Sequence, residues 1–352
     1  MPSQIARQAF LVMLSSVAAS AYASQVDTAN ASDTTVADTA VSQVADNADA
    51  IVTNDVENRT WVDKKHAQTK DWLGRTADSV DGWFGKQNPK DPARLSLRVM
   101  MDTTWNEYDG TSIKPRIRAK VKLPTLEDRL SIMIGDDTLD YEQTGEGVHN
   151  DERVNTPYEK DKRFDSRQTR EDNSSLAVRW SKFRKNTGID VDVGLRSDDL
   201  FVRARYKKDW QFANDYFARF EQMYRYGSQS EHTALTTFTV GQPQSDTRTI
   251  ANRTRLYYTH DGDEDIEWGN SLYQEHLWPS RLGERTLSYG IYTGGNIEDK
   301  QAHLNTYGPY VSYRQPVWRD WLFLQGDASY YNNKTEDRDH HVSLFGRVEV
   351  VF

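Results

Sequence analysis

The most restrictive feature of the sequence is an alternation of apolar residues close to its C-terminal end. Apolar residues or glycine occupy every second position from 342 to 352, and mostly polar residues stand between them: Val342, Leu344, Gly346, Val348, Val350 and Phe352. A period of two places successive side chains on opposite faces, so this segment predicts a β-strand with one apolar face. Such a strand suits a soluble sandwich, and it is required in a closed barrel, whose last strand pairs with its first.

This terminal strand resembles that of bacterial outer-membrane β-barrel proteins. In that family, a terminal phenylalanine preceded by alternating apolar residues is the signal read by the barrel-assembly machinery. The resemblance implies that Phe352 is the assembly signal and that the chain folds as an antiparallel up-and-down transmembrane barrel. It also implies three partners, namely outer-membrane lipid, lipopolysaccharide and the assembly machinery.

The composition is compatible with a barrel and excludes a bundle of membrane helices. The mean hydropathy of -0.82 is too low for apolar helices, whereas a barrel distributes its apolar residues in alternation. Interfacial aromatic girdles can draw on 18 Tyr and 10 Trp residues. The chain has no Cys, so no disulfide stabilises the fold.

The N-terminal part predicts export and a linker. Residues 1–23 combine Arg7, an apolar run and a small-residue cleavage site, which is typical of a secretory signal peptide. The apolar run is shorter than the roughly 20 residues that a membrane anchor needs. Residues 24–58 contain no aromatic residue and predict a disordered acidic linker in the periplasm.

A tryptophan repeat follows in residues 59–92. Trp61, Trp72 and Trp83 are spaced by eleven residues, close to three helical turns, so they share one stripe of a predicted amphipathic helix. Gly74 marks a possible break in this helix. Three roles remain open: a Trp face in the inner leaflet, a plug in the barrel mouth, or a helix packed on the periplasmic turns.

Residues 93–352 predict the barrel itself. Alternating runs separated by turn residues give about fourteen strands, or twelve if the weak alternation at 206–225 and 303–316 is discounted. An even number of strands places the N- and C-terminal ends of the barrel in the periplasm, with the longer connections outside the cell. The predicted strands lie near residues 94–101, 113–123, 130–134, 176–180, 189–195, 200–206, 211–225, 231–241, 250–260, 264–276, 284–294, 303–314, 319–331 and 340–352.

Basic residues follow the inward face of the predicted barrel. Five of them alternate along the second strand, and a charge on the lipid face at mid-membrane costs roughly 2–4 kcal/mol, so they must face the lumen. We call all the predicted pore-lining bases the basic wall: Arg94, Arg98, Lys114, Arg116, Arg118, Lys120, Lys122, Arg203, Arg205, Lys207, Arg253 and Arg255.

Two interpretations of the basic wall remain open. Inward acids are fewer, and Asp190 and Asp192 are expected to lie too many strands away to neutralise the whole wall, which favours an anion-preferring pore. The alternative is a closed barrel in which the bases pair with acids and with a folded-in loop, Asp137–Asn173. That loop resembles in length the constriction loop of general porins, but it also suits a solvated surface loop. The other predicted inward acids are Glu221, Glu267 and Glu275.

Enzymatic and metal-binding alternatives carry less weight. Ser230, His232 and His260 fall near the predicted outer rim, where a hydroxyl and an imidazole could serve acyl transfer to or from lipid. No motif of the barrel phospholipases, proteases or lipid A deacylases accompanies them. A divalent metal could bind near the last outer turn, at Asp337, Asp339, His340 and His341. A solvated loop without a metal is the simpler expectation for these residues. The sequence predicts no cofactor and no nucleic-acid partner.

Overall fold

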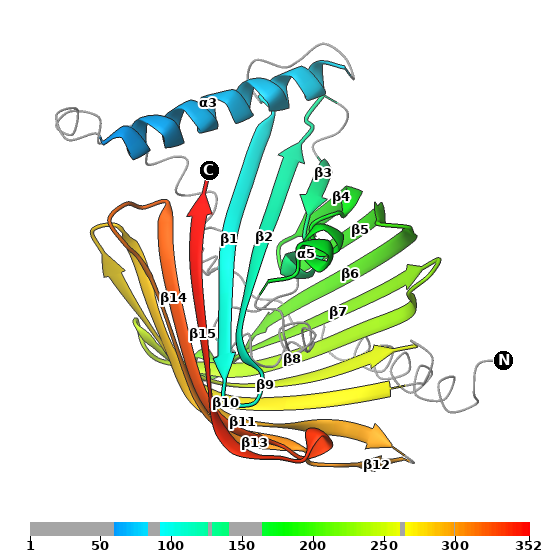
Figure 1. Cartoon of the computed structure of the whole chain (residues 1–352), viewed down its shortest axis with the longest axis vertical. Coiled ribbons are helices and arrows are strands. Elements are labelled where there is room, and N and C mark those ends of the chain that lie inside the picture. Colours follow the sequence, from blue (N-terminus) through cyan, green and yellow to red (C-terminus); the bar gives the residue numbers. More distant parts are fainter. Residues whose placement is uncertain (1–59, 84–91, 126–128, 141–163, 261–264, 299) are drawn as a thin grey trace. The chain divides into compact units, whose positions relative to one another are not determined.

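The alternating segments form the wall of a closed antiparallel β-barrel in the computed structural model (Figure 1). The structure describes residues 60–83, 92–125, 129–140, 164–260, 265–298 and 300–352. The predicted signal peptide and linker, residues 1–23 and 24–58, lie outside these ranges. The wall strands are β1 (Arg94–Asn106), β2 (Gly110–Lys122), β3 (Leu130–Gly135), β4 (Leu176–Arg184), β5 (Thr187–Arg196), β6 (Asp199–Gln211), β7 (Phe217–Gly227), β8 (Glu231–Ser245), β9 (Arg248–Thr259), β10 (Asp265–Ser280), β11 (Gly283–Glu298), β13 (Thr306–Pro316), β14 (Leu322–Asn333) and β15 (Arg338–Val351).

The sheet closes because its last strand pairs with its first. Each wall strand is hydrogen-bonded to its neighbours in sequence, and β1 pairs with β15 from Arg98↔Val351 to Asn106↔Ser343. The two-residue β12 (Gln301–Ala302) pairs only with the end of β11. The predicted up-and-down barrel of fourteen strands is therefore confirmed.

One predicted strand boundary is wrong. The sequence placed the seventh strand at 211–225, but β6 continues to Gln211 and β7 begins only at Phe217. Between them, in η5 (Ala213–Asp215), Asn214 and Asp215 adopt positive φ angles of 59° and 61°. A strand cannot pass through two left-handed residues, so the chain turns there.

Exposure separates the two faces of the wall. On β2, Ile117 is 43% exposed, whereas its neighbours Arg116 and Arg118 are 3% and 6% exposed. The apolar residues thus point outward and the arginines point into the lumen, as the alternation predicted. The outward apolar belt includes Val99, Met101, Ile117, Ile134, Val178, Val193, Val202, Val240, Ile250, Leu272, Ile291, Val311, Leu324, Leu344 and Val348.

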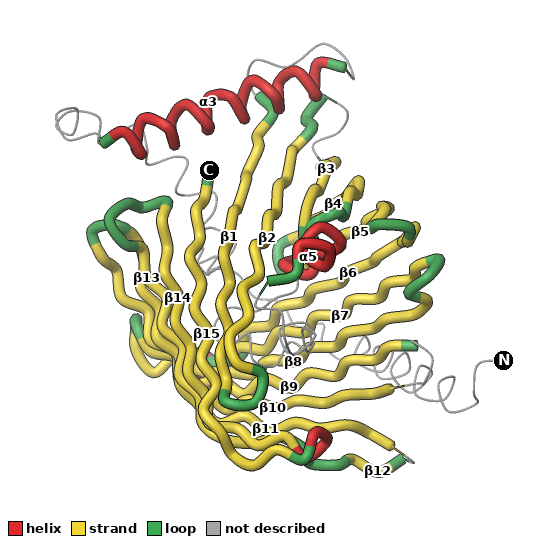
Figure 2. The backbone as a smooth tube through the Cα atoms, viewed as in Figure 1, coloured by secondary structure: helices red, strands yellow, loops and turns green. Residues whose placement is uncertain are grey.

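Helices are few in the described part of the chain (Figure 2). The predicted tryptophan helix is α3 (Trp61–Gly82), and it runs unbroken through Gly74, so the suggested break is wrong. Between β3 and β4 lie η3 (Asp137–Asp140) and α5 (Ser166–Asp172), and η6 (Lys334–Glu336) joins β14 to β15. None of these helices is both long and apolar enough to cross a bilayer.

Candidate functional site

The inward faces of β1, β2, β4, β5, β6, β13 and β15 carry a set of paired charges, which we call the ionic network. Alternation places every second side chain of these strands inside the barrel, and η3, α5 and the residue after β3 add further carboxylates. Within the described residues, the bases of the network are Arg98, Lys114, Arg116, Arg118, Arg179, Arg196, Arg203, Arg205, Arg314 and Arg347, and its acids are Asp102, Asp136, Asp137, Asp140, Asp172, Asp190, Asp192 and Glu349.

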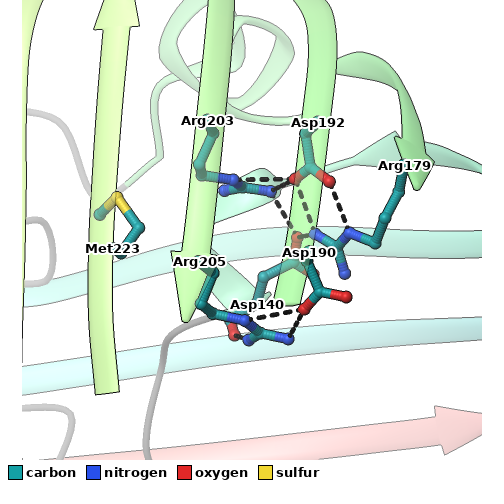
Figure 3. A pocket seen from close by; sticks show the side chains of 7 residues that line it. All are labelled: Asp140, Arg179, Asp190, Asp192, Arg203, Arg205 and Met223. Atoms are coloured by element: carbon teal, nitrogen blue, oxygen red, sulfur yellow. Dashed lines mark hydrogen bonds and ion pairs between the residues drawn. The ribbon is translucent and has the colours of Figure 1, made fainter. Parts of the chain in front are cut away.

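One centre of the network surrounds Asp140, at the end of η3. Its carboxylate accepts hydrogen bonds from three guanidinium groups, those of Arg118, Arg179 and Arg203, the last at 2.7 Å. Asp192 on β5 is also shared, with Arg179 Nε at 2.7 Å and Arg203 Nη2 at 2.6 Å. Figure 3 shows Asp140, Asp192, Arg179 and Arg203 converging on a small pocket, which is also lined by Asp190, Arg205 and Met223. The charged groups fill it so completely that about one water molecule would fit.

A second centre joins the first and last strands. Asp102 on β1 accepts two hydrogen bonds of 2.6 Å from Arg347, its direct partner across the β1–β15 pair, and one of 3.3 Å from Arg116. Glu349 accepts from Arg98 at 2.5 Å and from Arg314 at 2.9 Å. Asp102, Glu349, Arg116 and Arg347 are buried, whereas Arg98 and Arg314 are partly exposed. The ion pairs therefore reinforce the position where the barrel closes.

The carboxylates that follow β3 are held in their charged form. Burial alone would raise the pKa of Asp136, but the charge and the hydrogen bond of Arg116 outweigh it and lower the pKa to about 2. Burial also acts to raise the pKa of Asp140, but the charges of Arg179, Arg118 and Arg203 outweigh it. The pKa of Asp140 therefore lies well below its usual range. Both groups therefore remain ionised at neutral pH and anchor η3 to the wall.

The opposite wall is uncharged over much of its surface. Tyr273, Tyr310 and Tyr331 pack there with Ala251, and each is less than 10% exposed. Tyr292 lies over two glycines, Gly269 and Gly294, that pair with each other across β10 and β11. A Cβ atom added to Gly269 would lie 2.8 Å from the Tyr292 hydroxyl oxygen, and one added to Gly294 would lie 2.3 Å from it. The glycines thus let this ring lie against the wall. Small hydroxyl side chains complete this surface, including Ser271, Ser288, Ser312 and Ser329.

The predicted basic wall faces inward, and half of its members form ion pairs among the described residues. Six of its twelve members belong to the ionic network: Arg98, Lys114, Arg116, Arg118, Arg203 and Arg205. Arg253 donates instead to the Tyr273 hydroxyl at 2.9 Å. Arg94 and Lys120 are exposed, and the other three are half-buried: Lys122, Lys207 and Arg255.

The acids that neutralise the basic wall are more numerous than the alternation predicted. Asp190 and Asp192 are inward and buried as predicted, but carboxylates on other segments neutralise most of the arginines that they do not reach. The inward positions of Asp102 and Glu349 could have been found from the alternation of β1 and β15. Asp136, Asp137 and Asp140 carry no periodic signal, so only the folded chain reveals their role.

The residues of the enzymatic alternative do not form a hydroxyl–imidazole pair. The Ser230 hydroxyl donates to Asp199 Oδ2 at 2.7 Å. His232 Nδ1 lies 2.5 Å from the Tyr224 hydroxyl, and His260 Nε2 lies 3.0 Å from Glu231. The two histidines belong to an outward Tyr–His group, which is typical of a membrane-interface girdle.

The suggested metal ligands point to opposite sides of β15. His340 contacts the outward rings of Tyr307 and Tyr330, whereas His341 is 7% exposed, stacks edge-on against Tyr108 and lies 2.9 Å from the Asp339 carbonyl. No cluster of three or more potential metal ligands occurs among the described residues.

Comparison with known proteins gives similarity in structure only. No protein-family model and no curated protein matches the sequence. OmpT, an outer membrane protein of Vibrio cholerae, is 8% identical with a TM-score of 0.45, covering 76% of this chain and 99% of its own. OprB of Pseudomonas putida is 10% identical with a TM-score of 0.42, covering 80% and 97%. OccAB3 of Acinetobacter baumannii is 9% identical with a TM-score of 0.41, covering 74% and 98%. The chain is thus similar to solved structures of outer-membrane β-barrel proteins.

Proposed function

We propose that the chain is a bacterial outer-membrane barrel that forms a passive channel preferring small anions. The closed sheet satisfies its own backbone hydrogen bonds, and its outward face is an apolar belt, which are the two conditions for crossing a bilayer with strands. We further propose that Phe352 directs assembly in the outer membrane and that the N- and C-terminal ends of the barrel both face the periplasm.

The observation that carries the anion preference is the sharing of carboxylates. Asp140 is shared by three arginines, and Asp102, Asp192 and Glu349 by two each. The described network contains ten bases and eight carboxylates, so pairing reduces the positive charge of the wall but does not cancel it. A charged wall around a narrow aqueous path concentrates the counter-ion, here an anion.

Room for solute follows from the strand number and the packing of the tyrosines. About eight strands enclose little more than their own side chains, so a fourteen-stranded wall encloses more space than its side chains need. The Tyr292 ring lies over Gly269 and Gly294, which keeps it against the wall. We infer an aqueous path between the ionic network and the tyrosine-lined wall.

Reversal of unpaired lumen bases tests the anion preference. Lys120 and Lys207 form no ion pair within the described part of the chain, so changing both to Glu alters the field without breaking a buried pair. Arg116 and Arg118 are unsuitable because each is buried against a carboxylate. We expect wild-type protein in planar bilayers to be anion-selective, and Lys120→Glu with Lys207→Glu to shift the reversal potential toward cations.

The control is Lys185→Glu, the same charge change in the exposed β4–β5 turn, which should leave selectivity unchanged. The shift should shrink in molar salt, where the Debye length is about 3 Å. Cation selectivity of the wild-type channel, or no response to the double reversal, would contradict the proposal.

A closed barrel is the second candidate, because η3 and its ion pairs occupy the lumen side of β2–β6. It predicts folded protein, recognised by heat-modifiable migration on gels, that shows no conductance. The bilayer experiment therefore separates the two candidates directly.

A further inference from the structure

Helix α3 presents its tryptophans away from the barrel. Trp61 is 74% exposed, Trp72 57%, and Trp83, directly after the helix, 79%. At 100° per residue, their spacing keeps the three positions within about 40° of one another. Leu73 and Ala77, on the barrel side of the helix, are 6% and 0% exposed. Three large amphipathic side chains thus form a stripe that no described residue covers.

The docking site of α3 lies on the outward face of the barrel. Ala77 packs with Val121 and Leu123, and Val80 packs against the same cluster. Val121 is on the outward face of β2, four residues from the exposed Ile117, so α3 borders the apolar belt. The helix therefore continues a lipid-facing surface and does not plug the lumen.

The two ends of α3 are tied to connections between strands. Asp63 accepts two hydrogen bonds, of 2.6 and 2.7 Å, from Arg319, in the turn between β13 and β14. Asp81 accepts from the backbone and hydroxyl of Thr125, in the connection after β2, at 3.1 and 2.6 Å. Strand turns mark the membrane surface, so α3 lies where the apolar belt ends and the headgroups begin. Trp318, 46% exposed in the same turn as Arg319, is at this level too.

Basic side chains accompany the tryptophan stripe. Lys65 and Arg75 are exposed and lie within about 60° of Trp72 on a helical projection. Indole rings favour the membrane interface, and nearby Lys or Arg gains about 1 kcal/mol each beside an anionic lipid surface. Asp71, one position before Trp72, points about 100° away from the stripe. The acid and the tryptophans therefore face different surroundings.

We propose that the stripe formed by Trp61, Trp72 and Trp83, with Lys65 and Arg75, binds the anionic phospholipid headgroups of the leaflet at the barrel end where α3 docks. The helix lies in the plane of that interface and anchors the segment before β1 to the membrane. The contacts that support this surface are independent of whether the barrel conducts.

Site-directed spin labelling tests the proposal, and the chain has no native Cys to interfere. Ser79→Cys places a nitroxide on the exposed stripe. Asp71→Cys is the matched control, because it is also exposed but lies about 80° further round the helix. The full chain is folded into vesicles of phosphatidylethanolamine and phosphatidylglycerol. We expect collision with lipid-soluble oxygen, relative to a water-soluble nickel chelate, to be several-fold higher at Ser79 than at Asp71.

Replacement of Trp61, Trp72 and Trp83 by Ala should abolish this difference, and heat-modifiable migration verifies that the barrel of each variant is folded. In phosphatidylcholine vesicles without anionic lipid, the difference should be smaller, and changing Lys65 and Arg75 to Gln should remove that lipid dependence. Equal nickel accessibility at Ser79 and Asp71 would overturn the proposal. Dipolar coupling between Ser79 labels on two molecules would overturn it in favour of a second copy of the chain.

Discussion

Asp136 shows at the scale of one residue how the lumen charges depend on one another. Its carboxylate accepts from Arg116 Nε at 2.6 Å and from the backbone N–H of Thr138 at 3.0 Å, and all three residues are buried. Removing one partner of a buried ion pair typically costs about 3–5 kcal/mol, because the other charge stays behind without compensation. Asp136→Asn should therefore lower the unfolding midpoint of the purified barrel in denaturant.

The pH dependence gives this prediction its signature. Since the pKa of Asp136 is lower in the folded chain, at about 2, than its ordinary value of 3.8, its charge stabilises the fold above that ordinary value and ceases to do so as the pH falls toward 2. The difference between wild type and Asp136→Asn should be full at pH 6 and shrink between about pH 4 and pH 2. Asp209→Asn is the control, because the side chains of Asp209 and its partner Arg219 are each more than one-third exposed. A pH-independent difference would contradict the electrostatic explanation.

At the scale of elements, alternation predicted the strands well and the loop contacts poorly. On β2, the predicted faces are observed at Arg116, Ile117 and Arg118, because a period of two survives whatever the neighbouring strands are. Apart from Asp102, the acidic partners of Arg116 and Arg118 are Asp136 and Asp140 of η3. Neither carries a periodic signal, and both reach the wall only after β3 ends early at Gly135. Alternation assigns a face to each base, but pairing depends on how the whole sheet closes.

The terminal strand and α3 meet at Phe352, which makes the predicted assembly signal testable. The Phe352 ring stacks on His66 at 4.6 Å, and its backbone N–H donates to the Leu97 carbonyl at 2.8 Å. Phe352→Ala should lower the yield of folded outer-membrane protein, because it removes the aromatic residue that the assembly machinery is expected to read while leaving the backbone pairing possible. Folded and unfolded fractions are measured by heat-modifiable migration.

His66→Ala is the informative control for Phe352→Ala. It removes the stack on Phe352 and the contact of Nε2 with the Val351 carbonyl at 2.9 Å, but it leaves the terminal strand intact. If both variants lose the same yield, helix docking explains the effect and the signal interpretation is wrong.

At the scale of the whole molecule, closure with an even number of strands places both termini of the barrel at one end. The fourteen wall strands alternate in direction, so the turns fall into two sets at opposite ends of the barrel. The start of β1 and the end of β15 lie at one end, beside α3, as the Phe352–Leu97 hydrogen bonds show. The turn of Asp246 between β8 and β9 belongs to this same end, and Thr335 in η6 belongs to the other.

This division predicts which turns are reached from outside the cell. The chain has no Cys, so single substitutions in exposed turns report their own location: Thr335→Cys at the outer end and Asp246→Cys at the end of α3. With both termini in the periplasm, a membrane-impermeant maleimide should label Thr335→Cys in intact cells and Asp246→Cys only after the outer membrane is permeabilised. Both sites are polar turn positions, so a difference in labelling reports sidedness and not burial. The reverse pattern would invert the barrel and place α3 at the outer leaflet, and labelling of both sites in intact cells would show that the strands do not span the outer membrane.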